Sequence, residues 1–294
     1  MSDVSCTPIT DSLLRSWPLP SLAGSGGKED RGRAIVVGGP RQVPGGALLA
    51  AEAVLRVGSG KLHIATSASC QPSMGIAVPE AKVSTVLEDP EGNLAQARPD
   101  LEKEFSRADA VLVGPGMQPC AGSTRLVRQV ARACRCPLVL DAGALDGFRA
   151  APRLRTGRVI TPHFGEMARL LNLPLDEISA NPGGLALELA RETDSVIVLK
   201  SPTTFVAAPD GKCWAHTKGS IGLGTSGSGD VLAGLITGLL ARGAELAQAA
   251  VWGVRLHGKA GEHLSEQQGP VGFLAREISA MIPRFLADLT TDQV

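Results

Sequence analysis

Short runs of apolar residues that end in glycine or a polar residue alternate along this chain with segments of helical periodicity. Three of these runs are Ala34–Gly38, Ala110–Gly114 and Ser195–Lys200. A short apolar run bounded by turn residues is typical of a strand buried on both faces, as strands in parallel sheets are. Strands that alternate with helices form sheets covered by helices on both faces. The alternation therefore predicts an α/β fold with a mainly parallel sheet.

The remaining elements expected from the sequence continue this alternation. Further strands are expected at residues 62–65, 137–141 and 158–161, with a hairpin over residues 203–216 around the turn Pro209-Asp210-Gly211. Helices are expected at residues 47–58, 122–135, 165–171, 185–192 and over most of 230–289. No repeat and no second domain boundary is evident. One catalytic domain over residues 31–294 is therefore expected.

Residues 1–30 are expected to form an N-terminal leader ahead of this domain. A short amphipathic piece from Ile9 to Trp17 is followed by two prolines and a run of glycine and serine. The start of the chain lacks the basic residues and the apolar run of a signal peptide. No uninterrupted apolar stretch of about 18 residues occurs, so a membrane span is not expected.

Charge and cysteine content narrow the class of protein. Lys plus Arg and Asp plus Glu each number 29, and the chain has no Tyr. Balanced charge with few stacking side chains argues against a nucleic-acid partner. The six cysteines are scattered and form no Cys-x-x-Cys pair, which favours reduced thiols over disulfides or a metal site. The sequence therefore predicts a cytoplasmic enzyme.

Polar and glycine-rich residues follow several of the expected strands directly. They are Gly38-Gly39-Pro40, Gly114-Pro115-Gly116, Asp141-Ala142-Gly143, Thr161 to Glu166, and Lys200 to Thr204. Open α/β sheets bind ligands beyond the carboxyl ends of their strands. We therefore expect these residues to share one crevice.

The most informative segment is Gly222 to Asp230, a glycine-rich loop that opens into an apolar helix. Backbone N–H groups exposed by glycine and the positive end of a helix together form an anion site. A carboxylate beside such a site is explained if Asp230 accepts a proton from a hydroxyl that attacks a phosphoryl group. The simpler interpretation makes Asp230 an ordinary helix N-cap. The strand-end residues favour the catalytic interpretation.

The ordered series of these segments resembles the NAD(P)H-hydrate dehydratase family of the ribokinase-like superfamily. The resemblance covers roughly residues 9–289. The segments that carry it are Val37 to Pro40 with Pro44 to Ala51, Val113 to Gly116, Leu138 to Ala142, Thr161 to His163 with Gly165-Glu166, Val198 to Lys200, Gly227 to Gly234, and Gly253 to Gly258 with Ala260-Gly261.

The resemblance implies a ribokinase-like three-layer sandwich and a role in nicotinamide cofactor repair. ADP or ATP would phosphorylate the hydroxyl of the S epimer of hydrated NADH or NADPH, and elimination of phosphate would restore the cofactor. ADP, which would give AMP and phosphate, is favoured over ATP. The exchange is chemically sensible because phosphate is a far better leaving group than hydroxide.

The resemblance also implies roles for individual residues. Asp230 would be the base, and the amides near Gly227 and Gly229 would hold the transferring phosphoryl group. The nucleotide would lie along Lys200, Ser201, Pro202, Thr203 and Thr204 and against Gly229. The hydrated ring would contact Ala47, Gly116, His163 and Asp230. No side chain is predicted to ligate a metal ion.

The sequence departs from the family pattern near these residues. Gly143 stands where the family often has a second Asp, Phe164 replaces a Pro, and Ser201 replaces a Gly. The approach to the anion loop, Lys218 to Ile221, also differs from the usual Asn-Pro-Gly. None of these changes removes the base or the amides of the loop.

Cofactors and partners follow from the resemblance. Mg²⁺ is expected with the nucleotide, because phosphoryl transfer requires its charge to be neutralised. A homotetramer is expected. Many relatives carry an N-terminal epimerase domain for which this chain is too short, so the epimerase is expected to be a separate protein.

Two other functions remain open at this stage. A ribokinase-like kinase for a vitamin precursor or sugar would use the same Asp230 and anion loop, although Pro44 to Ala47 and Thr161 to His163 favour the dehydratase. The second alternative is a nucleotide-binding protein without catalysis, for which the altered approach loop and Gly143 leave room.

Overall fold

The computed structural model describes residues 5–21 and 26–290. Within them, eleven strands form one sheet in the order β1-β11-β10-β9-β8-β7-β6-β2-β3-β4-β5. The strands are β1 (Thr7–Pro8), β2 (Arg33–Val37), β3 (Lys61–Ser67), β4 (Lys82–Glu88), β5 (Leu94–Gln96), β6 (Ala110–Val113), β7 (Leu138–Leu140), β8 (Arg158–Ile160), β9 (Val196–Leu199), β10 (Thr204–Ala207) and β11 (Cys213–His216). The seven strands from β9 to β4 in this order are mutually parallel. The mainly parallel sheet is confirmed.

The expected hairpin is also confirmed, since β10 pairs antiparallel with both β11 and β9. Three strands were not expected: β1, β4 and β5. β1 and β5 are only two and three residues long, and β4 carries polar residues at several of its positions. Neither kind of segment gives the continuous apolar run that marks a central parallel strand.

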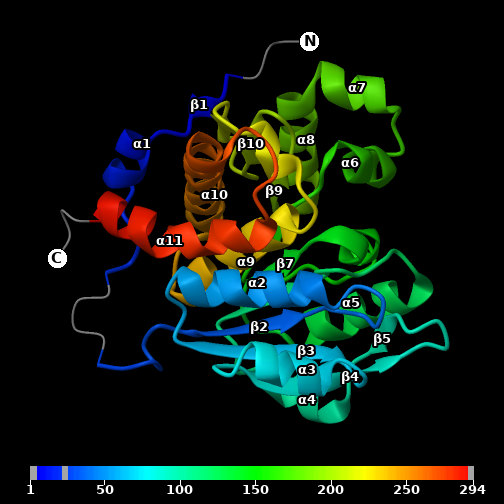
Figure 1. The fold of residues 1–294 in the computed structure, drawn as a ribbon. Helices are drawn as coiled ribbons and strands as arrows, with labels where there is room; N and C mark the ends of the chain where they lie inside the picture. The colour runs from blue at the N-terminus through cyan, green and yellow to red at the C-terminus, as the bar shows by residue number, and fades with distance from the viewer. Residues whose placement is uncertain (1–4, 22–25, 291–294) are drawn as a thin grey trace.

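Helices cover both faces of the sheet (Figure 1). They are α1 (Asp11–Ser16), α2 (Gly45–Arg56), α3 (Gln71–Ala77), α4 (Pro99–Phe105), α5 (Ala121–Ala133), α6 (Phe164–Leu171), α7 (Leu175–Ala180), α8 (Pro182–Thr193), α9 (Ser228–Ala241), α10 (Leu246–Gln268) and α11 (Ala275–Thr290), with 3₁₀ turns η1 (Ala142–Gly147) and η2 (Ile221–Gly224). Of these, α3, α4 and α7 were not expected. Within the described residues, none of the helices is long and apolar enough to cross a membrane.

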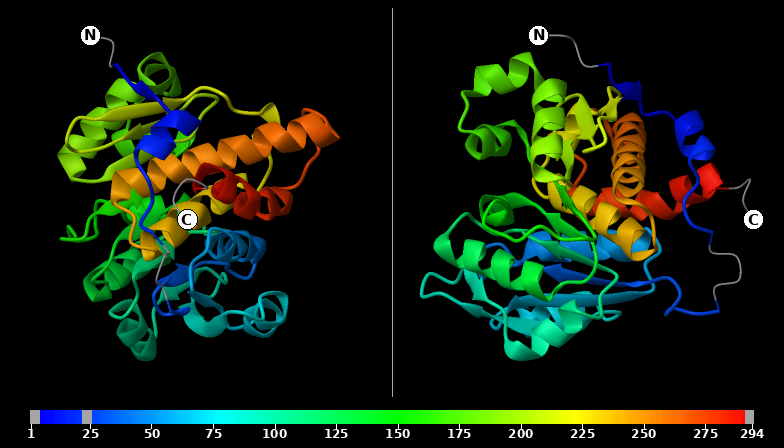
Figure 2. Two further views of the ribbon diagram at one scale, coloured as in Figure 1. Left: turned by 90° about the vertical axis from the view of Figure 1, so that its left-hand side faces the viewer. Right: turned by 180° about the vertical axis from the view of Figure 1, so that it is seen from behind.

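Two buried clusters occupy the two faces, because successive side chains of a strand point in opposite directions. In β2, Ala34 and Val36 join the cluster under α2, α9, α10 and α11, while Ile35 and Val37 join the one under α4, α5 and α8. The layers are therefore helix, sheet and helix, as predicted. The two views of Figure 2 show the long α10 and the shorter α11 on the first of these faces.

Close packing of α2 against α9 fixes the helix that begins at the glycine-rich loop. A Cβ added to Gly234 would lie 2.3 Å from the carbonyl oxygen of Ala50, and one added to Gly238 would lie 2.4 Å from Val57 Cγ1. Glycine at these two positions therefore lets the helix backbones approach more closely than any larger residue would allow. Packing against α2 therefore fixes the position of α9 and of the glycine-rich loop that precedes it.

Part of the segment expected as a leader packs onto the sheet and its helices. β1 pairs in parallel with β11, and Leu14 of α1 is completely buried in the core. Trp17 stacks on Trp214 of β11, with ring centroids 5.6 Å apart. Its carbonyl oxygen also accepts a hydrogen bond from Trp252 Nε1 at 2.9 Å. Residues 7–19 thus form part of the folded unit rather than an appendage to it.

The expectation that all cysteines are reduced is wrong for one pair. Cys6 and Cys213 form a disulfide across 207 residues of sequence. The pairing of β1 with β11 places these residues in register at the edge of the sheet, with Cα atoms 4.6 Å apart. Sequence spacing gives no sign of this contact, because a separation of that length depends on the whole topology. Cys70, Cys120, Cys134 and Cys136 are free thiols.

The packing of α1 gives a first test of this arrangement. We expect Leu14→Ala to lower the free energy of unfolding by about 2–5 kcal/mol, because the change leaves a cavity in the core. Leu175→Ala is the matched control, since Leu175 is 55% exposed and also lies on a short helix. Chemical denaturation measures both variants. Equal, small effects of the two changes would contradict the assigned packing of the N-terminal segment.

Candidate active site

Side chains at the carboxyl ends of three neighbouring strands meet as expected. Asp141 follows β7, Thr161 follows β8 and Lys200 follows β9. Asp141 Oδ1 accepts hydrogen bonds from Thr161 Oγ1 at 2.6 Å and from Lys200 Nζ at 2.7 Å. The side chain of Asp141 is 3% exposed and that of Lys200 is 20% exposed. A mostly buried ion pair therefore lies at the carboxyl ends of these strands.

The glycine-rich loop lies directly against this ion pair. A Cβ added to Gly229 would lie 3.2 Å from Lys200 Nζ, so the ammonium group is next to the start of α9. Gly227 is the N-cap of α9 and adopts the left-handed conformation, with φ of 88°. The first N–H groups of a helix have no acceptor within the helix and are available to an anion. The Lys200 ammonium group and these N–H groups therefore lie next to each other.

Asp230 lies in the first turn of α9, not at its N-cap, because Gly227 occupies the capping position. The interpretation of Asp230 as an ordinary N-cap is therefore wrong. Its carboxylate accepts a hydrogen bond from the backbone N–H of Gly116. Gly116 has a φ of 73°, and a Cβ there would lie 2.3 Å from the carbonyl oxygen of Val43. The tight turn after β6 needs glycine, and it directs a donor at the carboxylate.

The surroundings of Asp230 hold its pKa far above the ordinary value for an aspartate. Burial is the largest cause and raises the pKa to about 7, and the negative charges of Asp141 and Glu166 also raise it. The Lys200 ammonium and the Gly116 N–H oppose this shift. A carboxylate with a pKa near neutrality is a far better proton acceptor than an ordinary one.

Lys200 stays charged in the same surroundings. Burial alone would lower its pKa, but the carboxylates of Asp141 and Glu166, together with Asp230, raise it above the ordinary value for a lysine. The crevice therefore holds a cation beside the loop, where a phosphate would lie. Asp141 and Glu166 were quoted in the sequence motifs but were not assigned to the site. Their position directly after strands was the signal that could have found them.

His163 is the N-cap of α6. Its Nδ1 accepts hydrogen bonds from the backbone N–H groups of Gly165 at 3.0 Å and Glu166 at 3.3 Å, while Glu166 Oε2 accepts one from His163 N at 2.8 Å. This reciprocal capping box holds the turn after β8. A bridge between His163 and Lys200, in which Lys200 N donates to Pro162 O at 2.8 Å, places the turn beside β9. The exposed imidazole of His163 therefore has a fixed orientation beside the end of β9.

A buried histidine supports the anion loop from behind. His257 of α10 has its Nε2 2.9 Å from Ser228 Oγ and 3.1 Å from the carbonyl oxygen of Ser228. Burial lowers the pKa of His257 to about 4, so the ring is neutral. Its contact fixes the residue between the two loop glycines, Gly227 and Gly229.

The other residues expected in the site occupy more varied positions. Ala47 is completely buried beneath the turn at Gly39, so its side chain lines no open surface. Ser201 Oγ donates to Thr203 O, and Thr204 Oγ1 donates to Ser201 O, which leaves Pro202 exposed at the tip of the turn before β10. These bonds shape the turn, and contact of its residues with a nucleotide remains a prediction.

The departure at Gly143 has a steric reason. A Cβ at this position would lie 2.4 Å from the carbonyl carbon of Gln118, and Gly143 N donates to Met117 O at 3.1 Å. The loop after β6 therefore crosses directly over Gly143. An aspartate cannot occupy this position unless that loop moves.

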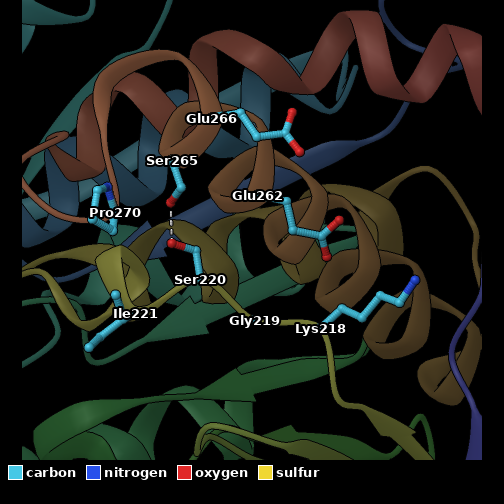
Figure 3. A pocket seen from close by; sticks show the side chains of 8 residues that line it. All are labelled: Lys218, Gly219, Ser220, Ile221, Glu262, Ser265, Glu266 and Pro270. Carbon is cyan, nitrogen blue, oxygen red and sulfur yellow. Dashed lines mark hydrogen bonds between the residues drawn. The ribbon is translucent and has the colours of Figure 1, made fainter.

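A cavity of about 460 Å³ lies beside the anion loop. Figure 3 shows its two walls, the segment Lys218 to Ile221 on one side and Glu262, Ser265 and Glu266 of α10 on the other. Ser220 and Ser265 hydrogen-bond across it. A Cβ on Gly219 would lie 3.4 Å from the carbonyl oxygen of Pro202. The cavity thus connects the turn after β9 to the segment that enters the loop.

Among the residues that the structure describes, His, Cys, Asp and Glu side chains form no group of three or more that could hold a metal ion. Asp141 is engaged by Lys200 and Thr161, and Glu166 caps α6. The described part of the chain therefore offers no ready-made metal cage.

The sheet order, the helices on both faces and a carboxylate beside a glycine loop define a ribokinase-like protein. A ribokinase-like superfamily protein from Enterococcus faecalis V583 superposes with a TM-score of 0.83 at 26% identity, covering 97% of this chain and 96% of that one. The family model for NAD(P)H-hydrate dehydratase matches residues 34–284. The chain belongs to this family, and the resemblance found in the sequence is confirmed.

Relatives in sequence and structure agree with this assignment. The ADP-dependent (S)-NAD(P)H-hydrate dehydratase of Xanthomonas campestris pv. campestris is 46% identical over 282 residues, which cover 95% of each chain. The ADP/ATP-dependent NAD(P)H-hydrate dehydratase from Bacillus subtilis, co-crystallised with ATP and Mg²⁺, superposes with a TM-score of 0.83 at 30% identity. That match covers 97% of this chain and 99% of the Bacillus chain.

Proposed function

We propose that this chain dehydrates the S epimer of hydrated NADH or NADPH back to the reduced cofactor, with ADP as the phosphoryl donor. The observation that carries the proposal is the position of Asp230, whose carboxylate has a pKa of about 7 and lies beside the anion loop and Lys200. Family membership supports the substrate class, and the printed name of the Xanthomonas relative supports ADP.

The residues divide the chemistry between them. Asp230 accepts the proton of the ring hydroxyl while the hydroxyl oxygen bonds to the terminal phosphorus of ADP. The bond between that phosphorus and the oxygen of AMP breaks at the same time. The N–H groups at Gly227 and Gly229 and the Lys200 ammonium bind the oxygens on which negative charge gathers. Phosphate then leaves with the electrons of the carbon–oxygen bond, a ring proton is lost, and the double bond of the dihydronicotinamide is restored.

The cavity between Lys218–Ile221 and α10 is the proposed place of the nucleotide base. Its lining residue Gly219 lies next to the carbonyl oxygen of Pro202, and its lining residue Ile221 begins η2, which leads along the chain to the anion loop. A nucleotide whose base occupies this cavity can run past Lys200 to Thr204 with its phosphates at Gly229. The altered residues of the approach, Lys218 to Ile221, then form a wall of the base pocket and leave the phosphate site unchanged.

Mg²⁺ is proposed to accompany the nucleotide. Mg²⁺ is usually held by substrate phosphates, water and one or two protein groups, not by an all-protein cage. The absence of a ligand cluster among the described residues fits this mode. When bound, the ion neutralises phosphate charge that Lys200 alone cannot balance.

Recovery of absorbance at the reduced nicotinamide band tests the reaction. Hydrated NADH with ADP is expected to regain that absorbance with release of AMP and phosphate, and ATP is expected to be less effective. Omission of nucleotide is the control. No recovered absorbance, together with a phosphorylated product from a vitamin precursor or sugar, would establish the kinase instead. Gly116, His163 and Asp230 remain the residues proposed to contact the ring, whereas Ala47 is completely buried and packs beneath the turn at Gly39.

The pKa of Asp230 sets the expected pH dependence. Only the ionised carboxylate accepts a proton, so kcat/KM is expected to rise through a pKa of about 7 and to fall about tenfold per pH unit well below it. The charge of Lys200 lowers the pKa of Asp230. The rise of kcat/KM is therefore expected at a higher pH in the Lys200→Met variant. Stopped assays between pH 5 and 9 measure the dependence of kcat/KM on pH. Lys212→Met is the control variant for Lys200→Met. A profile that is flat in this range would contradict the role of Asp230.

Assembly and location complete the proposal. We propose a cytoplasmic homotetramer that works with a separate epimerase, because an enzyme restricted to the S epimer needs the R epimer to be converted. Sedimentation velocity measures the assembly. The dependence on an epimerase is tested with a mixture of the two epimers. This mixture is expected to be consumed completely only after an epimerase is added.

A further inference from the structure

A second polar cavity, of about 430 Å³, lies at the amino ends of the strands, at the opposite end of the sheet from Asp230. Arg33, Lys61 and Lys82 are the first residues of β2, β3 and β4, and these strands are adjacent and parallel. Their amino ends therefore meet at one place, just as the carboxyl ends of β7, β8 and β9 meet at the crevice. Lys28 and Arg107 complete the basic lining.

The cavity has an excess of positive charge. Glu80 and Glu104 are the carboxylates that line it. Lys82 Nζ holds Glu104 at 2.9 Å, and Glu29 outside the lining pairs with Lys61. Within the described part of the chain, Lys28 and Arg107 have no carboxylate in ion-pair contact. These two cations are therefore available to an anionic ligand.

One wall of the cavity is fixed by close backbone packing. A Cβ on Gly60 would lie 1.8 Å from the carbonyl oxygen of Lys28. Gly60 N donates to Arg31 O at 3.0 Å, and Lys61 N donates to Gly32 O at 2.9 Å. The segment that carries Lys28 is thus held across the start of β3, and the cavity does not depend on long surface side chains alone.

A buried histidine in the lining has an unpaired nitrogen. The side chain of His63 is 3% exposed, and its Nε2 lies 2.9 Å from Ser84 Oγ. Nδ1 is buried and has no hydrogen-bond partner among the described residues, and Glu104 Oε2 at 3.7 Å is too distant to serve. Burial, with a smaller contribution from Lys82, lowers the pKa of His63 to about 4, so the ring is neutral at pH 7.

We propose that this cavity binds a small molecule that carries a phosphate group, with His63 donating through Nδ1–H and Lys28 and Arg107 supplying charge. In the tautomer that the proposal requires, the Ser84 hydroxyl donates to Nε2 and the single proton of the neutral ring lies on Nδ1. A buried donor without an acceptor is costly, and a phosphate oxygen satisfies it. The site is separate from the one proposed to hold ADP, and it does not depend on that function.

Imidazole nitrogen signals of His63 test the proposal, because they report this site and not the anion loop. Inorganic phosphate and glycerol 3-phosphate are titrated separately at constant ionic strength and pH 7.5, and His63→Gln assigns the signals. Saturable movement of the His63 signals is expected with at least one probe, and the stronger of the two identifies free or esterified phosphate as the ligand. Signals that do not move with either probe overturn the proposal.

Variants separate this site from general electrostatics. Lys28→Ala/Arg107→Ala is expected to weaken the binding reported by His63 at least tenfold, with ADP-dependent turnover at the wild-type level. Arg128→Ala/Arg132→Ala removes the same charge from the exposed face of α5 and is expected to leave the binding unchanged. Equal affinities for the two double variants would also overturn the proposal.

Discussion

Asp230→Asn is expected to lower kcat of the dehydratase reaction by about 10³-fold, within the range of a lost general base. Asparagine keeps the size of the side chain but cannot accept the hydroxyl proton. Nucleotide binding is expected to persist, because the loop N–H groups and Lys200 are unchanged. Removing a buried carboxylate close to Asp141 and Glu166 also relieves repulsion. Fluorescence or calorimetric titration with ADP and a turnover assay measure the two quantities.

Asp176→Asn is the matched control, since Asp176 is also an acidic residue in the first turn of a helix but is exposed. It is expected to leave kcat at the wild-type value. An Asp230→Asn protein that keeps its turnover would refute the role as base. A wild-type protein that binds ADP but is as inactive as the variant would instead establish the nucleotide-binding protein without catalysis.

Lys200→Met is expected to reduce both activity and stability. Without the ammonium group, Asp141 is left as a buried charge with only Thr161 as a side-chain partner. Breaking one side of a buried pair costs roughly 3 kcal/mol of the free energy of unfolding or more. The anion position also loses its cation, so kcat/KM with ADP is expected to fall about 10²-fold. Urea denaturation and steady-state kinetics measure the two effects.

Two further variants separate these effects. Asp141→Asn in the Lys200→Met background removes the unpaired charge and is expected to restore much of the stability without restoring activity. Lys212→Met breaks an exposed ion pair with Asp210 that has the same 2.7 Å separation and is expected to leave stability unchanged. If the Lys200 and Lys212 variants were equally stable, the buried pair would have no structural role.

The sequence predicted the sheet well, and also the meeting of Asp141, Thr161 and Lys200, where the chain is locally consistent. Runs such as Ala110–Val113 are apolar throughout because both faces of the strand are buried, and the polar residue after each run falls at the same edge. The alternation of elements was therefore enough to predict that these strand-end residues lie at one end of the sheet. The ion pair between Asp141 and Lys200 could not be predicted in this way, because it depends on the strand order β7-β8-β9 across 59 residues.

Other features also depend on contacts between residues far apart in sequence and could not be predicted from local patterns. The role of residues 7–19 depends on contacts with β11 and α10, which the short, proline-rich segment does not encode by itself. The conformation of Gly116 and the donor that it directs at Asp230 follow from the loop at Val43, far away in sequence. Gly143 looked like a lost functional residue, although its neighbour Gln118 shows that it is a packing requirement.

The two-residue strand β1 has a consequence for how this protein can be handled. An exposed strand edge is a template on which other chains can pair, and natural sheets protect such edges with very short strands or proline. Thr7–Pro8 does both for β11. Removing the first twenty residues would uncover the backbone of Cys213–His216, and such shortened preparations should precipitate or form fibrils at concentrations that the intact chain tolerates.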